Sequence, residues 1–305
     1  MIVRWGLDAL PEVLVGRASF LLATQRWEPP VSVIGRWSEL PTDAPIDPGD
    51  AEVLLAVGGG STIDTAKRVS AEAGLPLVSV PTTYSGAEWT TYYGVRDASR
   101  RMRGGGGGSH NEAIVYDVEL TLELPRDVTG GTSMNALAHC CEALYVRGRD
   151  PDADPLALAG ADEISAALPQ VLDEPGDRRA REALLRAAAK AGEALARSGL
   201  ALAHAVAQVI GGRYGLPHGA LNAICLPPAL RFNDDFVHAA LLAGRAAERA
   251  EELARGAGFT TLGALGVPEA DLPGLAAAIA RRPGALANPR PASDADVLGL
   301  LRTLL

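Results

Sequence analysis

The chain has 305 residues, of which 48% are hydrophobic and 21% are charged. This length and composition are typical of a soluble globular protein with one large domain or two ordinary ones. The formal net charge of −9 argues against a nucleic acid or an anionic membrane surface as a partner, because neither attracts a negative field.

The cysteines and the first residues bear on the cellular compartment. Cys140, Cys141 and Cys225 are too few and too unevenly placed for a disulfide framework, so we expect reduced, buried thiols. The opening MIVRWGLDAL lacks a basic segment followed by an apolar one, and we expect no signal peptide. No uninterrupted apolar stretch reaches membrane-spanning length. The prediction is a cytoplasmic protein.

Four short apolar runs near the start are predicted to be strands buried on both faces of a parallel sheet: 18–24, 31–35, 51–60 and 75–83. The third run leads into glycines and then into STIDTAKRVSAEAG, which has helical periodicity and a terminal glycine. Strand, glycine-rich turn, helix and strand in this order predict a parallel α/β unit.

From about Thr129 the sequence changes to long segments rich in Ala, Leu and Arg with helical periodicity, for example 158–171 and 178–199. We therefore expect an α/β domain over residues 1–128 and an all-α domain over residues 129–305, with a cleft between them.

Two features of the first domain are unusual. The six residues QRWEPP separate the first two strand candidates, too few for a crossover helix, so a helix has been lost or replaced by a turn. The second feature is GGGGGS at 104–109, in a basic context. Its composition favours a mobile surface loop, and the alternative is a loop that orders over a substrate.

The segment VGGGSTIDTAK (57–67) is the first candidate binding site. Glycines at the carboxyl end of a strand let backbone N–H groups approach a phosphate, whose charge the following helix N-terminus favours. A plain turn is the alternative, since the glycine spacing of a GxGxxG fingerprint is missing. VPTTYSGAEWT (80–90) follows the next strand, at the edge where open α/β sheets bind ligands, and a polar loop is its alternative.

Three histidines suggest a second site. Asn135 and His139 lie four residues apart and share one face of a predicted helix. His204 lies in another helical pattern, and His218 follows in GLPHG, where a turn can direct its ring back to that helix. Three neutral imidazoles suit Zn²⁺ or Fe²⁺, with a fourth position for the Asn135 oxygen, water or substrate. Polar residues within a helical core are the alternative.

Four segments, in order, resemble the motifs of the iron-containing alcohol dehydrogenase family: GGGSTIDTAK, PTTYSGAEWT, NALAHCCEALY and GGRYGLPHGALNAICLPPALRFN. IVYDVELTLELP (114–125) and NPRP (288–291) resemble its maleylacetate reductase branch. The similarity runs from about Leu54 to the C-terminus. It implies a dehydroquinate synthase-like fold, in which an α/β dinucleotide-binding domain with a parallel sheet, here truncated, precedes an all-α metal-binding domain.

The resemblance also implies a cofactor, NAD(P)H, and its binding residues. The pyrophosphate would be held by Gly58, Gly59, Gly60 and Ser61, and the nicotinamide side would be lined by Thr82, Thr83 and Ser85. The family's metal ligands, an aspartate and three histidines, fall on Asn135, His139, His204 and His218. A divalent metal, Fe²⁺ or Zn²⁺, would polarise a carbonyl or alkoxide oxygen while hydride moves to or from the nicotinamide. Family habit further implies a homodimer.

The chain departs from the family pattern in three ways. Asn135 replaces the usual aspartate and removes the only anionic ligand. The resemblance implies catalytic roles for His204 and for residue 208, four positions later. Many members have a second histidine at that position, but this chain has Gln208, and an amide cannot relay a proton at neutral pH. The N-terminal region is shorter, and Arg26 near the end of an early strand would favour the 2′-phosphate of NADP over NAD.

The leading hypothesis is an NAD(P)-dependent oxidoreductase that acts on a small hydroxy or oxo acid at the interdomain cleft. Four arginines near the glycine run are candidates to attract a carboxylate, or else form a solvated basic loop: Arg96, Arg100, Arg101 and Arg103. One alternative is a tailoring dehydrogenase of a daptide-type peptide pathway, in which oxidation of a C-terminal threonine gives a β-keto acid that loses carbon dioxide. Another is a scaffold or partner subunit that retains the fold without redox chemistry.

Overall fold

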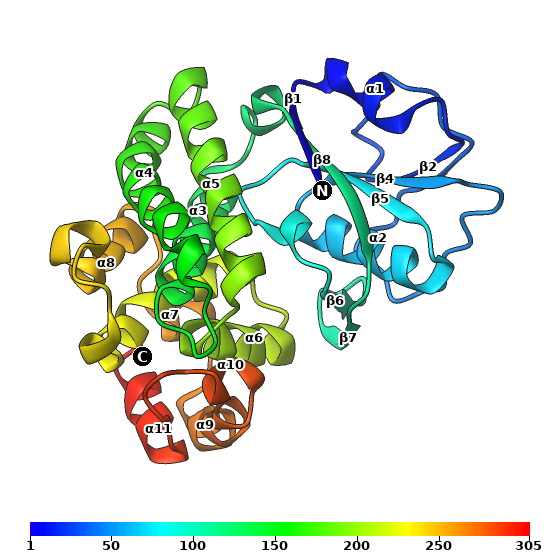
Figure 1. Cartoon of the computed structure of the whole chain (residues 1–305). Coiled ribbons are helices and arrows are strands. Elements are labelled where there is room, and N and C mark those ends of the chain that lie inside the picture. Colours follow the sequence, from blue (N-terminus) through cyan, green and yellow to red (C-terminus); the bar gives the residue numbers. More distant parts are fainter. The chain divides into compact units, whose positions relative to one another are not determined.

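The computed structural model describes all 305 residues of the chain. It contains two compact units: unit 1 spans Met1–Leu122 and unit 2 spans Glu123–Leu305. The boundary lies before the one expected after residue 128, because helix α3 (Arg126–Ala143) already begins within the predicted α/β domain. Figure 1 shows unit 1 as a sheet with helices and unit 2 as a group of helices.

Unit 1 is built on a six-stranded sheet in the order β1-β8-β5-β4-β2-β3, in which all neighbours are parallel. The strands are β1 Ile2–Trp5, β2 Ser19–Ala23, β3 Gly35–Trp37, β4 Val53–Gly58, β5 Pro76–Pro81 and β8 His110–Tyr116. Side chains alternate between two cores. Leu21, Leu55 and Val78 pack on the face of α1 (Leu10–Leu14). Phe20 and Leu54 pack on the face of α2 (Gly60–Ala73), which confirms a doubly covered parallel sheet.

Three of the four predicted strands are confirmed as β2, β4 and β5. The remaining predicted strand, 31–35, is wrong except at its last residue, where β3 begins. Val31 and Val33 instead pack against the α1 side of the sheet, outside any strand. The β2–β3 connection contains no helix, so this irregular apolar segment covers the sheet where a crossover helix is expected.

The glycine run is not the mobile loop that its composition predicts. Residues Met102–Gly106 form β7, which pairs antiparallel with β6 (Tyr93–Arg96) and brings Gly106 opposite Tyr93. A Cβ at Gly106 would lie 2.7 Å from the Tyr93 hydroxyl oxygen, so glycine there lets the Tyr93 ring lie across the hairpin.

Unit 2 is helical, as expected. Its α-helices are α3 Arg126–Ala143, α4 Asp154–Asp173, α5 Arg178–Ser198, α6 Leu202–Tyr214, α7 His218–Phe232, α8 Ala246–Gly256, α9 Leu272–Ala280, α10 Pro283–Leu286 and α11 Asp294–Arg302. The predicted segments 158–171 and 178–199 are confirmed as α4 and α5. Helix α3 is buried on nearly every side from Thr129 to Ala143. Polar residues within α3 must therefore find partners among the neighbouring helices.

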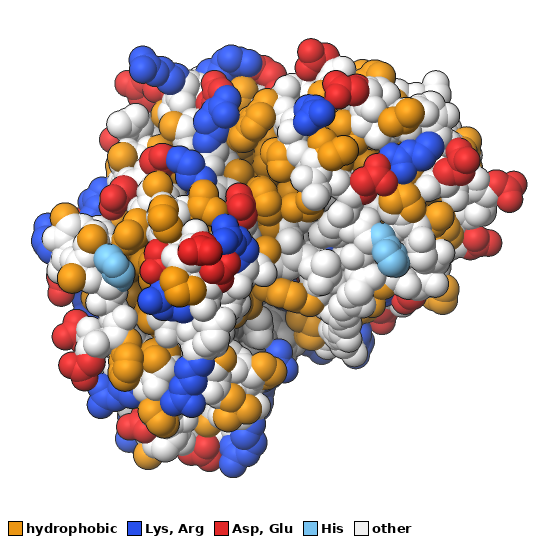
Figure 2. All heavy atoms as spheres, viewed as in Figure 1, with side chains coloured by type: hydrophobic (Ala, Val, Ile, Leu, Met, Phe, Trp, Pro, Cys, Tyr) orange, Lys and Arg blue, Asp and Glu red, His pale blue; other side chains and the backbone are white.

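The cysteines are buried thiols, as the sequence predicts. All three cysteines are free and buried. Acidic and basic side chains are interspersed over the face seen in Figure 2. No single helix is long and apolar enough to cross a membrane, and only α5 and α6 together, bent by 99°, meet that criterion by length and composition.

Candidate functional site

The glycine turn of unit 1 lies at the start of α2. Strand β4 ends at Gly58, and Gly59 is the N-cap of α2, so the N-cap residue supplies no side-chain acceptor to the N–H groups of the first turn. A Cβ at Gly58 would lie 2.6 Å from Thr62, and one at Gly59 would lie 3.0 Å from Thr83. Gly60 and Ser61 are the first helical residues. The turn predicted to hold a phosphate therefore presents backbone donors at a helix N-terminus.

The hydroxyls predicted to line the nicotinamide side follow the adjacent strand. The N–H of Thr82 donates to the Gly58 carbonyl at 2.9 Å, which joins the ends of β4 and β5. The hydroxyls of Thr82 and Thr83 are buried without a hydrogen-bond partner. Buried hydroxyls are usually satisfied, so these two are available to a ligand at this edge of the sheet. Ser85 lies beside the same turn, with Oγ 3.0 Å from where a Gly60 Cβ would stand.

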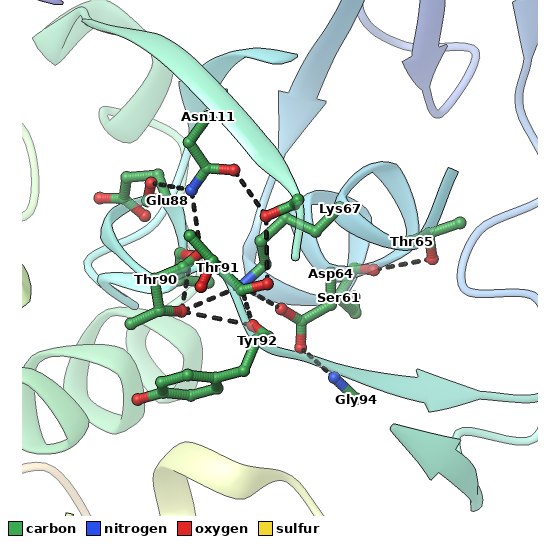
Figure 3. A network of polar contacts seen from close by, with 12 residues as sticks. Ser61, Asp64, Thr65, Lys67, Glu88, Thr90, Thr91, Tyr92, Gly94 and Asn111 are labelled. Atoms are coloured by element: carbon green, nitrogen blue, oxygen red, sulfur yellow. Dashed lines mark hydrogen bonds and ion pairs between the residues drawn. The ribbon is translucent and has the colours of Figure 1, made fainter. Parts of the chain in front are cut away.

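A buried lysine that the sequence analysis missed supports this loop. Lys67 on α2 is 1% exposed, and its Nζ donates to the carbonyls of Ala87 at 2.8 Å and Tyr92 at 2.6 Å and to Thr90 Oγ1 at 3.1 Å. The ammonium also lies 2.8 Å from the Asp64 carboxylate. Figure 3 shows Lys67 at the centre of this network. It fastens residues 87–92, which follow the threonines, to the helix that begins at the glycine turn.

A second buried network holds the same segment from the other side. Tyr116 on β8 donates its hydroxyl to Glu88 Oε1 at 2.7 Å and accepts from Trp89 Nε1 at 2.8 Å. Burial raises the pKa of the Glu88 carboxyl above its usual value, although the bond from Tyr116 and the charge of Lys67 oppose the shift.

The predicted histidines come together in unit 2. Asn135 and His139 lie on α3, His204 lies on α6, and His218 is the first residue of α7. The rings of His139 and His204 stack with centroids 4.8 Å apart, and the His218 ring centroid lies 5.7 Å from that of His204. His110 and His238 are exposed and lie outside the cluster, as expected.

Glycines explain how His218 reaches α3. A Cβ at Gly219 would lie 2.4 Å from the carbonyl carbon of Gly131, and one at Gly131 would lie 3.3 Å from the Ala220 nitrogen. The start of α7 therefore packs directly on the backbone of α3, and only glycine permits this approach.

Two further side chains complete the cluster. Glu142 is fully buried, and its Oε2 lies 2.7 Å from His204 Nδ1. Asn222, also fully buried, donates from Nδ2 to Asn135 Oδ1 at 2.7 Å and lies 3.0 Å from His218 Nε2. Both lie one helical turn from a predicted residue, Glu142 after His139 and Asn222 after His218, which is the signal that the sequence offered.

The cluster is arranged as a hydrogen-bonded network. The donor types suit Zn²⁺ or Fe²⁺, and burial together with His204 and His218 lowers the pKa of His139, which keeps that imidazole neutral. However, no group of three or more His, Cys, Asp or Glu side chains is arranged to hold a metal ion. The amide nitrogens of Asn135 and Asn222 instead face Nε2 of His139, at 3.4 Å, and Nε2 of His218. The present arrangement therefore does not match a coordination sphere, and ligation by these four residues stays a prediction.

The catalytic candidate Gln208 lies at the margin of this cluster. It follows His204 by one turn of α6 and is partly exposed. Its Oε1 accepts a hydrogen bond from the Arg282 guanidinium at 3.2 Å. Two of the four hairpin arginines have local partners: Arg103 pairs with Asp97 at 2.8 Å, and Arg96 donates to the Arg100 carbonyl.

The chain is similar to known proteins in both sequence and fold. Residues 26–110 match the iron-containing alcohol dehydrogenase model, and residues 129–305 match the C-terminal model of the Fe-containing alcohol dehydrogenase family. A maleylacetate reductase of Burkholderia cepacia is 36% identical over 69% of this chain, and the match covers 57% of the relative's length. A maleylacetate reductase of Rhizobium sp. strain MTP-10005 is 34% identical, over 83% of this chain and 73% of the relative.

Solved structures agree with this result. The crystal structure of the Rhizobium maleylacetate reductase superposes with a TM-score of 0.86 at 29% identity, over 100% of this chain and 95% of that one. An iron-containing alcohol dehydrogenase of Corynebacterium glutamicum gives a TM-score of 0.88 at 27% identity, over 100% of this chain and 94% of that one. The expected dehydroquinate synthase-like fold is confirmed. The chain belongs to the iron-containing alcohol dehydrogenase family, close to its maleylacetate reductases.

Proposed function

We propose that this protein is an NAD(P)H-dependent oxidoreductase that transfers hydride between a nicotinamide and the carbonyl carbon of a small oxo acid. The observation that carries the proposal is the buried cluster of unit 2, in which three imidazoles and two amides from three helices meet. The names of the relatives, maleylacetate reductases, support the coarser part of this proposal, an oxidoreductase.

Unit 1 is proposed to bind the dinucleotide. The uncapped N–H groups after Gly59 suit a pyrophosphate, whose negative charge the start of α2 stabilises. The buried hydroxyls of Thr82 and Thr83, next to this turn, are proposed to contact the nicotinamide side together with Ser85.

Unit 2 is proposed to bind the carbonyl group. Hydride arrival at the carbonyl carbon converts the carbonyl oxygen to an alkoxide, which fixed hydrogen-bond donors stabilise more than they stabilise the neutral ketone. The amide groups of Asn135 and Asn222 are the donors in the cluster, and each would exchange a present partner, an imidazole nitrogen or the Asn135 oxygen, for the alkoxide. Glu142 fixes the ring of His204 beside them. Gln208 cannot release a proton at neutral pH, so we propose that water protonates the alkoxide.

Two alternative hypotheses, a scaffold without redox chemistry and a peptide-tailoring dehydrogenase, differ in what they require of these sites. A scaffold needs neither the cluster nor the orphan hydroxyls beside the glycine turn. The peptide-tailoring hypothesis involves the same hydride transfer and the same substrate groups, because a C-terminal threonine carries both a hydroxyl and a carboxylate. Assembly as a homodimer stays a prediction, which light scattering tests.

The proposal is tested by incubating the purified protein with NADPH or NADH and maleylacetate while following the absorbance of the reduced nicotinamide. We expect turnover that His204→Ala abolishes and that His238→Ala, an exposed histidine outside the cluster, leaves unchanged. A peptide ending in threonine, assayed with the oxidised cofactors, distinguishes the tailoring reading. Absence of turnover with all of these substrates would contradict the proposed function.

A further inference from the structure

One cation beside the cluster has no anion in this chain. Arg282 is exposed at the N-cap of α10, and its guanidinium donates a hydrogen bond to Gln208 Oε1. Its neighbour Arg281 pairs with Asp294, and Arg213 at the end of α6 pairs with Asp271. Arg282 forms no such pair, so its charge and most of its N–H donors remain available.

The packing of α10 fixes where this charge lies. A Cβ at Gly284 would lie 2.6 Å from the carbonyl oxygen of Ala201, the N-cap of α6, so the first turn of α10 rests directly on the start of α6. Gln208 lies one turn after His204 on α6. Exposure therefore increases along these three residues: His204 is buried, Gln208 is partly exposed, and Arg282, which is bonded to Gln208, is exposed.

Gln208 suits this arrangement because it is neutral. Its Oε1 accepts from the guanidinium and so limits the positions of a flexible side chain, yet it leaves the positive charge unneutralised. A carboxylate at this position would pair with Arg282 and compete with an anionic ligand. The carboxylate of the cluster, Glu142, is already engaged by His204 and by the N–H of Ala201.

We propose that Arg282 binds the carboxylate of the oxo-acid substrate and that Gln208 positions its guanidinium. This rests on the proposed function and makes Arg282 the residue that selects a charged substrate. The planar fork of arginine donates two parallel N–H groups to a carboxylate, a geometry that lysine cannot reproduce. Of the hairpin arginines of unit 1, which the sequence suggested for this role, Arg103 already pairs with Asp97 and Arg96 donates to the Arg100 carbonyl.

The test compares kcat/KM for maleylacetate, which carries carboxylates, with kcat/KM for butanal, which carries none, in the wild type, Arg282→Ala and Arg282→Lys. Loss of a charge-assisted bond predicts that Arg282→Ala lowers kcat/KM for maleylacetate by about 10- to 100-fold, mainly through KM. The value for butanal and the affinity for NADPH should stay within about twofold. Arg282→Lys should recover only part of the loss, and the adjacent Arg281→Ala should change neither substrate.

Equal losses for both substrates, or no loss for maleylacetate, would overturn the role of Arg282 while leaving the proposed function intact. Calorimetric titration with maleate separates the two ideas when turnover is absent. Binding to the wild type that Arg282→Ala loses would support the carboxylate site by itself. Maleate binding unaffected by the variant, or no binding to the wild type, would overturn it.

Discussion

The carboxylate of Glu142 lies 2.7 Å from Nδ1 of His204, and the two side chains are 0% and 1% exposed. Because the carboxylate oxygen accepts, Nδ1 of His204 is the donor in this contact. The other ring nitrogen, Nε2, lies 3.3 Å from Asn135 Oδ1. The same carboxylate accepts from the N–H groups of Ala201 and His204, so one side chain of α3 fixes both the ring and the start of α6.

Glu142→Gln is expected to loosen the orientation of His204 while preserving side-chain volume. Replacing a carboxylate partner of a functional histidine typically costs about 10- to 100-fold in activity, and we expect a loss of kcat/KM in this range with unchanged NADPH affinity. Steady-state kinetics and a cofactor titration measure the two quantities. Glu163→Gln, which alters a surface pair with Lys190, is the control. Wild-type kinetics in Glu142→Gln would show that the contact only stabilises the fold.

Lys67→Met is expected to destabilise unit 1. It leaves the carbonyls of Ala87 and Tyr92 without their donor and the Asp64 carboxylate without its partner. Breaking a buried charge network of this kind costs about 3 kcal/mol. All four tryptophans, Trp5, Trp27, Trp37 and Trp89, lie in unit 1, so urea unfolding followed by tryptophan fluorescence reports on this unit alone.

Arg4→Met is the control within unit 1, because both side chains of the ion pair of Arg4 with Glu12 are solvent-exposed and such a pair contributes about 1 kcal/mol or less. Cofactor affinity should also fall in Lys67→Met, since residues 87–92 follow the threonines proposed to contact the nicotinamide. Unchanged stability would mean that Lys67 does not fasten this segment.

Glu88→Gln is expected to change how the stability of unit 1 depends on pH. Burial raises the pKa of Glu88 in the folded chain above its usual value of 4.5, so the unfolded chain loses this proton first as the pH rises. The wild type therefore loses stability above pH 4.5 relative to the neutral glutamine variant. The difference between variant and wild type should grow from acidic to neutral pH.

Glu112→Gln, on β8 of the same unit, provides a control of opposite sign. The hydrogen bond from Arg17 lowers the pKa of Glu112, so this contribution is present at neutral pH and is lost in acid. The glutamine variant should be less stable than the wild type at neutral pH and should approach it in acid. Parallel pH profiles for the two variants would contradict the assignment of Glu88.

Asn135→Asp is expected to favour metal binding. An aspartate would add an anionic ligand beside His139, His204 and His218, and an added negative charge near a divalent cation should raise the affinity for Zn²⁺ by about tenfold or more. Calorimetry of the wild type and the variant measures this difference. Equal affinities would mean that these side chains are not the ligands.

The sequence predicts the strand and the helix that meet at the glycine turn. It does not predict strands whose formation depends on pairing with a distant strand. Strand β4 and helix α2 follow from an apolar run, glycines and a helical period, and both were found. Strand β1 has only four residues and was missed, because its pairing with β8 depends on a partner more than a hundred residues away. The run at 31–35 has the composition of a strand, but Val31 and Val33 cover the sheet instead.

The site was predictable to a similar degree. The spacing of Asn135, His139, His204 and His218 indicated one cluster, and the structure brings these residues together. Asn222 repeats on α7 the four-residue spacing of Asn135 and His139 on α3, and this symmetry was overlooked. The contact between Arg282 and Gln208 joins residues 74 positions apart, so no local pattern reveals it.

The most direct test of the account is a fluorescence titration of the wild type and Gly59→Asp with NADPH and NADH. A carboxylate at the N-cap of α2 would occupy the donors proposed for the pyrophosphate and repel its charge. Gly176→Asp, at an exposed glycine with open space around its Cβ position, is the control. The account predicts saturable binding by the wild type and Gly176→Asp that Gly59→Asp loses. No binding of either cofactor to the wild type, or equal binding to Gly59→Asp, would contradict it.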